Sequence, residues 1–152
     1  MNTPDDMPGY TLHPQLAADS LPVGHFPLCE LRRINESRYP WYLLIPRLGG
    51  LSELHDLDEP QLGQLMRESR ALAQALHTLH TPDKLNIAVL GNIVPQLHVH
   101  HIARHRSDAS WPHPVWGRFP TIPLDPDAAQ AQIHAMQATL ACNGLTPTQG
   151  TS

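Results

Sequence analysis

The chain has 152 residues, 41% of them hydrophobic, which suits a single domain with its own core. Its 14 acidic and 10 basic residues give a formal net charge of −4, which argues against a protein that coats nucleic acid. Two cysteines are too few for a disulfide framework, and no apolar run is as long as a membrane span. The polar first residues do not resemble a signal peptide, so we expect a cytoplasmic protein.

Five prolines lie within residues 1–27, so a short amphipathic turn over residues 12–18 is the most regular structure expected there. Residues 28–34 alternate apolar and polar side chains, and residues 41–45 form a continuous apolar run. Both patterns are typical of strands, and together they predict part of an antiparallel meander.

A long helix is predicted next. Asp58 offers an N-cap, Pro60 suits the first turn, and the helix should run to about His80. Apolar residues recur in it at every third or fourth position, which predicts one stripe packed on a sheet. The side chains expected in that core are Leu62, Leu65, Met66, Leu72, Ala73, Leu76 and Leu79.

The rest of the chain completes an α+β domain over residues 1–144. Strands are expected over residues 85–90 and 96–104, and an irregular proline-rich segment should follow. A second helix is predicted over 127–140, with Ile133, Met136 and Leu140 facing inward, and residues 145–152 are expected to be disordered. This order predicts an antiparallel sheet with the long helix on one face and a C-terminal helix.

The predicted strand 96–104, QLHVHHIAR, carries the candidate chemistry. Side chains alternate across a strand, so Gln96, His98 and His100 share one face. Leu97 and Val99 share the opposite face, which must be the buried one because both are apolar. His98 and His100 are therefore predicted to lie on an open face.

Three uses of these histidines remain open from the spacing alone. Neutral imidazoles can attack phosphorus or acyl carbon, or relay protons. His98 and His100 could instead bind a metal, with His101 or His105 as a third ligand, or they could simply be exposed. His101 lies on the apolar face, so we expect it to be a hydrogen-bonded core residue.

GNIVPQLHVHHIAR resembles the signature of the histidine triad (HIT) family, His-x-His-x-His followed by two apolar residues. The strand with Cys29, the WYLLIPR strand, the LHDLDEPQL helix start and the Asn86-to-Gly91 element come in family order. The resemblance covers about residues 10–118, and the chain is most similar to small bacterial members classed as hydrolases.

The resemblance implies a dimer that binds a purine nucleotide beside the motif strand. Family enzymes release a nucleoside monophosphate from a phosphoanhydride, such as a dinucleoside polyphosphate, or from a phosphoramidate. They do so through a nucleotidyl-histidine intermediate. The motif contains no acidic cluster suited to Mg²⁺, so this mechanism requires neither a protein-bound metal nor another cofactor.

By position, His98 matches the family nucleophile, and His100 the residue that donates hydrogen bonds to the phosphate or the bridging oxygen. The other nucleotide contacts implied are Asn35 near the ribose, Asn86 at the phosphate, and Gly91, Asn92 and Ile93 in the loop before the strand.

Two departures from the family pattern leave alternatives. Gln96 replaces the first histidine; its amide can orient His98 or touch a phosphate but cannot titrate. Trp41 replaces a supporting histidine and is expected to pack in the core. A nucleotide-binding protein with weak catalysis is therefore the alternative to the hydrolase, and a metal-binding module is a third interpretation.

The roles of two features near the motif strand remain open. Trp111 and Trp116 either close over the site, lie across a dimer partner, or only pack against neighbouring side chains. Arg104 is expected to form a surface or dimer ion pair rather than to bind phosphate.

Overall fold

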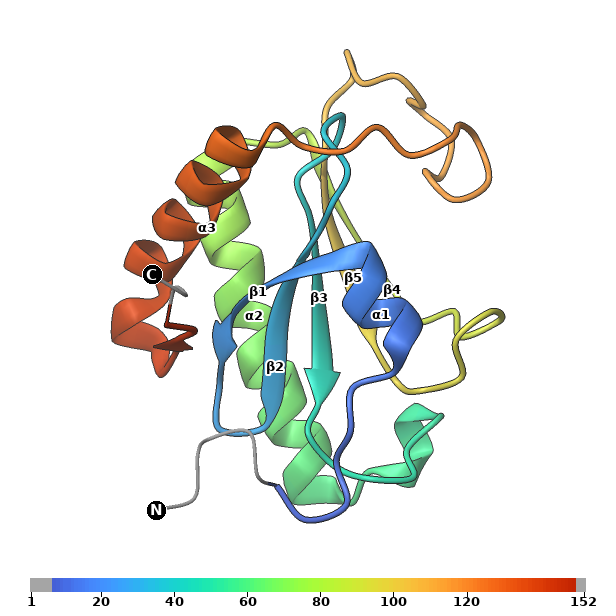
Figure 1. Cartoon of the computed structure of the whole chain (residues 1–152), viewed down its shortest axis with the longest axis vertical. Coiled ribbons are helices and arrows are strands. Elements are labelled where there is room, and N and C mark those ends of the chain that lie inside the picture. The colour runs from blue at the N-terminus through green and yellow to red at the C-terminus, as the bar shows by residue number, and fades with distance from the viewer. Residues whose placement is uncertain (1–6, 150–152) are drawn as a thin grey trace.

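A computed structural model of the chain describes residues 7–149 and shows one six-stranded sheet with helices on both faces (Figure 1). The elements are α1 (Pro14–Asp19), β1 (Ser20–His25), β2 (Cys29–Ile34), β3 (Trp41–Pro46), η1 (Leu54–Asp56), α2 (Glu59–His80), β4 (Lys84–Ala88), β5 (Val99–Arg104), α3 (Pro126–Leu140), η2 (Ala141–Asn143) and β6 (Thr146–Pro147). The strand order is β4-β5-β3-β2-β1-β6, and each strand pairs antiparallel with its neighbours. The predicted α+β architecture is therefore confirmed.

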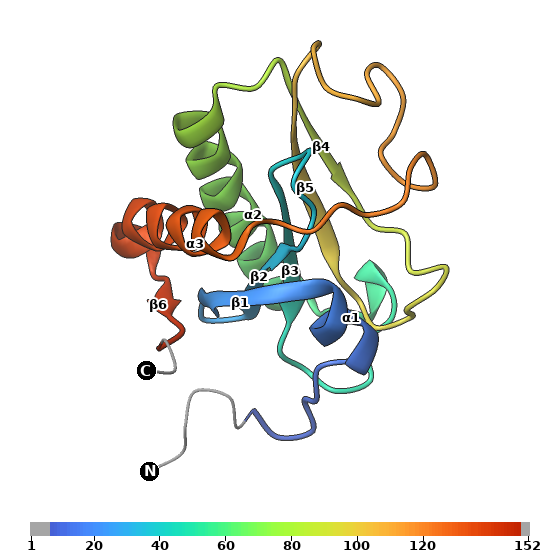
Figure 2. The same ribbon diagram turned by 45° about the horizontal axis from the view of Figure 1, so that its top comes forward.

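The main core lies between the sheet and the two long helices. Figure 2 shows α2 and α3 on the same side of the sheet. Buried side chains of the sheet and of both helices meet there: Leu31, Tyr42, Leu44, Val99 and Ala103 from the sheet, Leu65, Leu72 and Leu76 from α2, and Ile133, Met136 and Leu140 from α3. Burial of apolar area is the main force that holds these layers together.

The opposite face of the sheet is covered by shorter segments. Leu16 of α1 and Val94 of the β4–β5 loop pack on Leu43 and Ile45. A second small cluster joins Tyr39, Ile102 and Val115, with Trp41 and Trp116 packed against it. His98 and His100 are 6% and 7% exposed. The prediction of an open face is wrong, because α1, the β4–β5 loop and the segment after β5 cover it.

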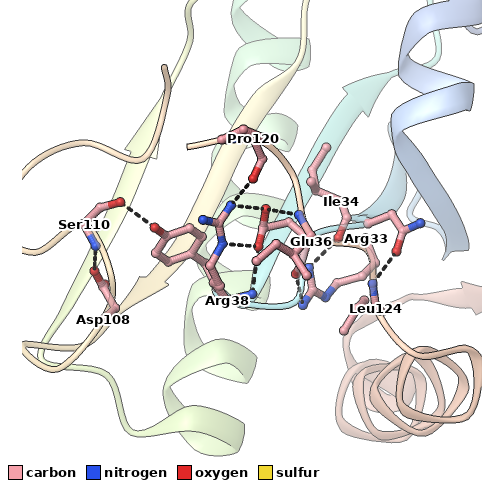
Figure 3. Close-up of polar contacts among 11 residues, drawn as sticks. Arg33, Ile34, Glu36, Arg38, Asp108, Ser110, Pro120 and Leu124 are labelled. Carbon is pink, nitrogen blue, oxygen red and sulfur yellow. Dashed lines mark hydrogen bonds and ion pairs between the residues drawn. The ribbon is translucent and has the colours of Figure 1, made fainter. Parts of the chain in front are cut away.

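The segment that follows β5 is tied to the β2–β3 turn (Figure 3). Arg38 pairs with Glu36 at 2.8 Å and donates to the Pro120 carbonyl at 2.6 Å. The backbone N–H of Ile122 donates to the same Glu36 carboxylate. Tyr39 and Ser110 share a buried hydrogen bond. These bonds hold the irregular residues 105–125 across the sheet.

The long helix begins as predicted: the Asp58 carboxylate accepts from the N–H of Gln61 at 2.8 Å. The expected core positions are wrong for Leu62 and Met66, which are 37% and 49% exposed. At about 100° per residue, both lie to one side of the line through Leu65 and Leu72 that faces the sheet. Within residues 7–149, no helix combines the length and hydrophobicity that a membrane span requires.

Two terminal strands were not predicted. β1 contains Pro22 and an irregular register, which hides the period-two pattern, yet it pairs with β2 along most of its length. β6 pairs Thr146 with His25, and Leu145 is buried, so the prediction of disorder is wrong for residues 145–149. Residues 150–152 lie outside the described residues.

Candidate functional site

A cavity of about 600 Å³ lies on the face of the sheet opposite α2 and α3. Its floor is formed by His98 and His100 together with β3. The walls are α1, the β4–β5 loop and the segment after β5. The lining residues are Gln15, Leu16, Ala18, Asp19, Ile34, Asn35, Trp41, Leu43, Leu90, Gly91, Asn92, Ile93, Val94, His98, His100, Trp116, Thr121 and Pro123.

His98 comes immediately before β5, and its ring is held by the chain itself. The His98 Nδ1 atom lies 2.7 Å from the Gln96 carbonyl oxygen. A carbonyl only accepts hydrogen bonds, so Nδ1 carries the proton, and in the neutral ring Nε2 keeps its lone pair. The site therefore contains a fixed imidazole with one unprotonated nitrogen.

His100 lies beside His98 with 4.9 Å between the ring centroids. Burial, together with the neighbouring His98 and His101, lowers the pKa of His100 to about 3. His100 is consequently neutral at physiological pH. It can offer a hydrogen bond to a bound group without carrying a charge.

Trp41 corrects a prediction, because it lines the cavity instead of packing in the main core. Its indole N–H donates to His100 Nδ1 at 3.0 Å. Trp116 lies close to both, with its ring centroid 5.9 Å from that of Trp41 and 5.2 Å from that of His100. Three alternatives were open for Trp116, and the structure places it in the wall of the cavity. Nothing local in the sequence indicated that its side chain turns inward.

Gln96 does not reach the cavity with its side chain. Its amide oxygen accepts from the backbone N–H of His13 at 2.8 Å, and its amide nitrogen donates to the Thr11 carbonyl at 2.9 Å. The expectation that the side chain orients His98 is wrong, since the backbone carbonyl performs that contact. The side chain instead fixes the residues that lead into α1, one wall of the site.

We expect Gln96→Ala to lower the free energy of unfolding by ~1–2 kcal/mol, because two hydrogen bonds across 83 and 85 residues of sequence are lost. Urea unfolding measures this change, and amide exchange should accelerate in α1. Gln130→Ala, at an exposed glutamine of α3, is the matched control and should change stability by less than ~0.5 kcal/mol. Equal effects of the two variants would contradict this stabilising role of the two Gln96 hydrogen bonds.

The predicted nucleotide contacts divide into two groups. Asn35, Gly91, Asn92 and Ile93 line the cavity. The Asn35 side-chain oxygen accepts from the N–H of Leu124 at 2.9 Å, so it also anchors the chain after β5. Gly91 has φ +75°, a left-handed conformation that suits glycine and turns the chain out of β4.

Asn86 is not brought to the cavity. It lies in β4 opposite Ile102, and its side-chain oxygen accepts from Arg104 at 2.8 Å. Arg104 itself is 1% exposed and pairs with Asp108 of the same chain at 2.7 Å. The expectation of a surface or dimer ion pair at Arg104 is therefore wrong.

His101 is confirmed as a hydrogen-bonded core residue, and its contacts bear on the metal interpretation. Its Nε2 shares a hydrogen bond with Ser69 at 2.7 Å, and burial lowers its pKa to about 4. His105 Nε2 donates to the His80 carbonyl at 2.9 Å. In the part of the chain that the structure describes, no three His, Cys, Asp or Glu side chains are grouped to hold a metal ion.

Several proteins of solved structure are similar to this chain. A model of the HIT domain family matches residues 15–107. The histidine triad protein of Bradyrhizobium japonicum is 45% identical, with a TM-score of 0.85 and coverage of 87% of this chain and 98% of that one. The one from Marinobacter aquaeolei is 39% identical, with a TM-score of 0.85 and coverage of 88% and 97%.

A third structure, a histidine triad protein of Sinorhizobium meliloti, is 35% identical with a TM-score of 0.84 and covers 86% of this chain and 97% of its own. A search of curated proteins found no match. The family model spans more than half of the chain, and it includes both histidines of the cavity. The chain therefore belongs to the histidine triad (HIT) family.

Proposed function

We propose that this protein is a nucleotide hydrolase or transferase that takes a nucleoside monophosphate from a phosphoanhydride or phosphoramidate through a bond to His98. Membership of the HIT family supports a nucleotide-binding or hydrolase-type role. The observation that carries the proposal is the fixed ring of His98. Its Nδ1 is occupied by the Gln96 carbonyl, and the ring borders a cavity large enough for a nucleotide.

The first step forms a bond between His98 Nε2 and the α-phosphorus while the bond to the leaving group breaks. Imidazole suits this step because it is nucleophilic when neutral and leaves phosphorus readily afterwards. The Gln96 carbonyl accepts from Nδ1–H and stabilises the positive charge that develops on the ring. Water then attacks the phosphorus, the N–P bond breaks, and the nucleoside monophosphate is released.

The charge of the cavity is consistent with one reacting phosphate held by neutral donors. Asp19 is the one residue among the lining set that bears a formal charge at pH 7 with histidines neutral. In this proposal Asn92 and the N–H of His100, both in the lining, are neutral donors to the phosphate. Leu16, Ile34 and Leu43 supply apolar surface for a base.

Trapping the intermediate tests the proposal. Pure protein is mixed in a single turnover with an α-labelled adenylyl phosphoramidate or a diadenosine polyphosphate and quenched in base. Mass spectrometry of the peptide with residues 96–104 should show an acid-labile AMP adduct on His98. The adduct should be absent from His98→Ala.

The alternative is a nucleotide-binding protein without useful catalysis, which the missing first histidine favours. A nucleotide that binds the native state raises its apparent stability, so a thermal shift reports binding without turnover. Stabilisation by AMP, with neither an adduct nor a product from either substrate type, would show that the protein binds nucleotides without hydrolysing them.

A further inference from the structure

The contact between Trp41 and His100 sets the protonation of the second histidine of the site. An indole N–H is a donor and has no lone pair to accept with. It points at His100 Nδ1 over 3.0 Å, so that nitrogen must accept and cannot carry a proton. The proton of the neutral ring therefore lies on Nε2.

Both rings are fixed by the sheet. Trp41 opens β3 and pairs with Ile102, while His100 of β5 pairs with Leu43 on one side and with Ala88 on the other. The Trp41 carbonyl accepts from the buried Arg33 guanidinium at 3.3 Å. Trp116 meets His100 edge-on with 77° between the ring planes, so neither ring of the Trp41–His100 pair can turn freely.

From this geometry we propose that Trp41 is a positioning residue, which holds His100 as a neutral Nε2–H donor so that the leaving group departs as an anion. The inference rests on the proposed function and narrows its substrate class. Leaving groups that are stable as anions, such as a phosphate, a carboxylate or an acidic phenolate, fit this site. An amine leaving group does not, because it must gain a proton.

The step balances without a proton donor. The lone pair of His98 Nε2 forms the bond to phosphorus, and the electron pair of the broken P–O bond leaves with the oxygen. His100 keeps its proton and stabilises the anion by a hydrogen bond. Protonation of His100 at Nδ1 would set two N–H groups against each other at 3.0 Å, so the ring does not act as an acid.

The titratable groups around His100 do not supply the missing proton. His98 is the nucleophile, and its Nδ1–H is held by the Gln96 carbonyl. His101 projects to the opposite face of β5 and is bonded to Ser69. Asp19 on α1 also lines the cavity and bears a negative charge at pH 7. Gln96 replaces the remaining histidine and cannot titrate.

The tautomer can be measured directly on the full chain. With ¹⁵N-labelled histidine, long-range proton–nitrogen NMR should show the His100 proton on Nε2. The ring should not titrate between pH 5 and 8, a window of about three pH units around the ordinary pKa of histidine. His100→Gln identifies its signals. A wild-type His100 with its proton on Nδ1 would overturn the inference, whether or not the protein turns over any nucleotide.

Trp41→Phe removes the N–H and keeps an aromatic ring. We expect His100 to become a mixture of tautomers and kcat to fall about tenfold, the effect of one lost hydrogen bond, while KM changes less than about twofold. Trp116→Phe is the matched control. The Trp116 indole nitrogen has no hydrogen-bond partner within residues 7–149, so its loss should leave the His100 tautomer unchanged. An unchanged tautomer in Trp41→Phe would contradict the positioning role.

The leaving-group claim is tested with aryl esters of AMP whose phenols differ in acidity, alongside an AMP amidate of an unactivated amine. The wild-type rate should fall steeply as the phenol becomes less acidic, and the amidate should be the slowest substrate. An amidate cleaved as fast as the most reactive ester would overturn this inference and leave the proposed function standing. No turnover of any ester, with no adduct on His98, would overturn the proposed function itself.

Discussion

His98→Ala is expected to abolish turnover, with kcat reduced by at least about 10⁴-fold, the loss typical of a removed nucleophile. In the structure His98 is the ring with an oriented Nδ1 and a free Nε2 at the cavity, and His100 has its Nδ1 occupied by Trp41. No other side chain of the cavity lining offers a nitrogen lone pair in this position. Steady-state hydrolysis of an AMP ester measures the effect.

Nucleotide binding should survive this change, because alanine removes one side chain of the lining and leaves the walls in place. His105→Ala is the matched control: its Nε2 bonds the His80 carbonyl, and the residue is not part of the cavity lining. Its kcat should remain within about twofold, as is usual for substitutions outside a site. Full activity in His98→Ala would exclude the covalent mechanism.

Arg104→Met is expected to lower the free energy of unfolding by ~3–5 kcal/mol, the usual cost of breaking a buried ion pair from one side. Arg104 and Asp108 have side chains 1% and 6% exposed, and their pair lies at 2.7 Å. Burial alone would raise the pKa of Asp108, but the hydrogen bonds from Arg104 and from the N–H groups of His105 and Ser110 hold it below its ordinary value. Methionine would leave this carboxylate without its cation.

Urea unfolding measures this loss. Arg67→Met, at an exposed arginine of α2 that bonds Gln64, is the control and should change stability by less than ~0.5 kcal/mol. Arg104→Met combined with Asp108→Asn should cost less than the sum of the two single changes, because each removes the same pair. A loss below ~1 kcal/mol in Arg104→Met would contradict a structural role for the pair.

Arg104 also connects stability to the site. It donates to the His113 carbonyl at 2.9 Å, three residues before Trp116. With the Tyr39–Ser110 bond, this contact fixes the segment that forms one wall of the cavity. The wall beside His100 is thus built from long-range polar contacts, and its position depends on a charge pair outside the cavity.

Local pattern was sufficient for much of the fold. Period-two alternation in the motif strand separated Leu97 and Val99 from His98 and His100, and the structure keeps this division. Asp58 and Pro60 marked the start of α2. The apolar spacing over 127–140 gave α3 with its inward residues. These features depend on the neighbours of each residue along the chain, so a single sequence contains them.

The sequence by itself determined the two-faced motif strand, the nucleophile candidate His98, and the family to which the motif points. The tertiary structure alone decided the partners that complete the site. Trp41 meets His100 over 59 residues, and Gln96 meets His13 over 83. The Trp41–His100 contact depends on strand order and register, because a shift of one residue turns every side chain to the other face. The Gln96–His13 contact joins two segments that lie outside the strands. No local pattern encodes that register, which is why the roles of Trp41, Gln96, Asn86 and Arg104 emerged only from the fold.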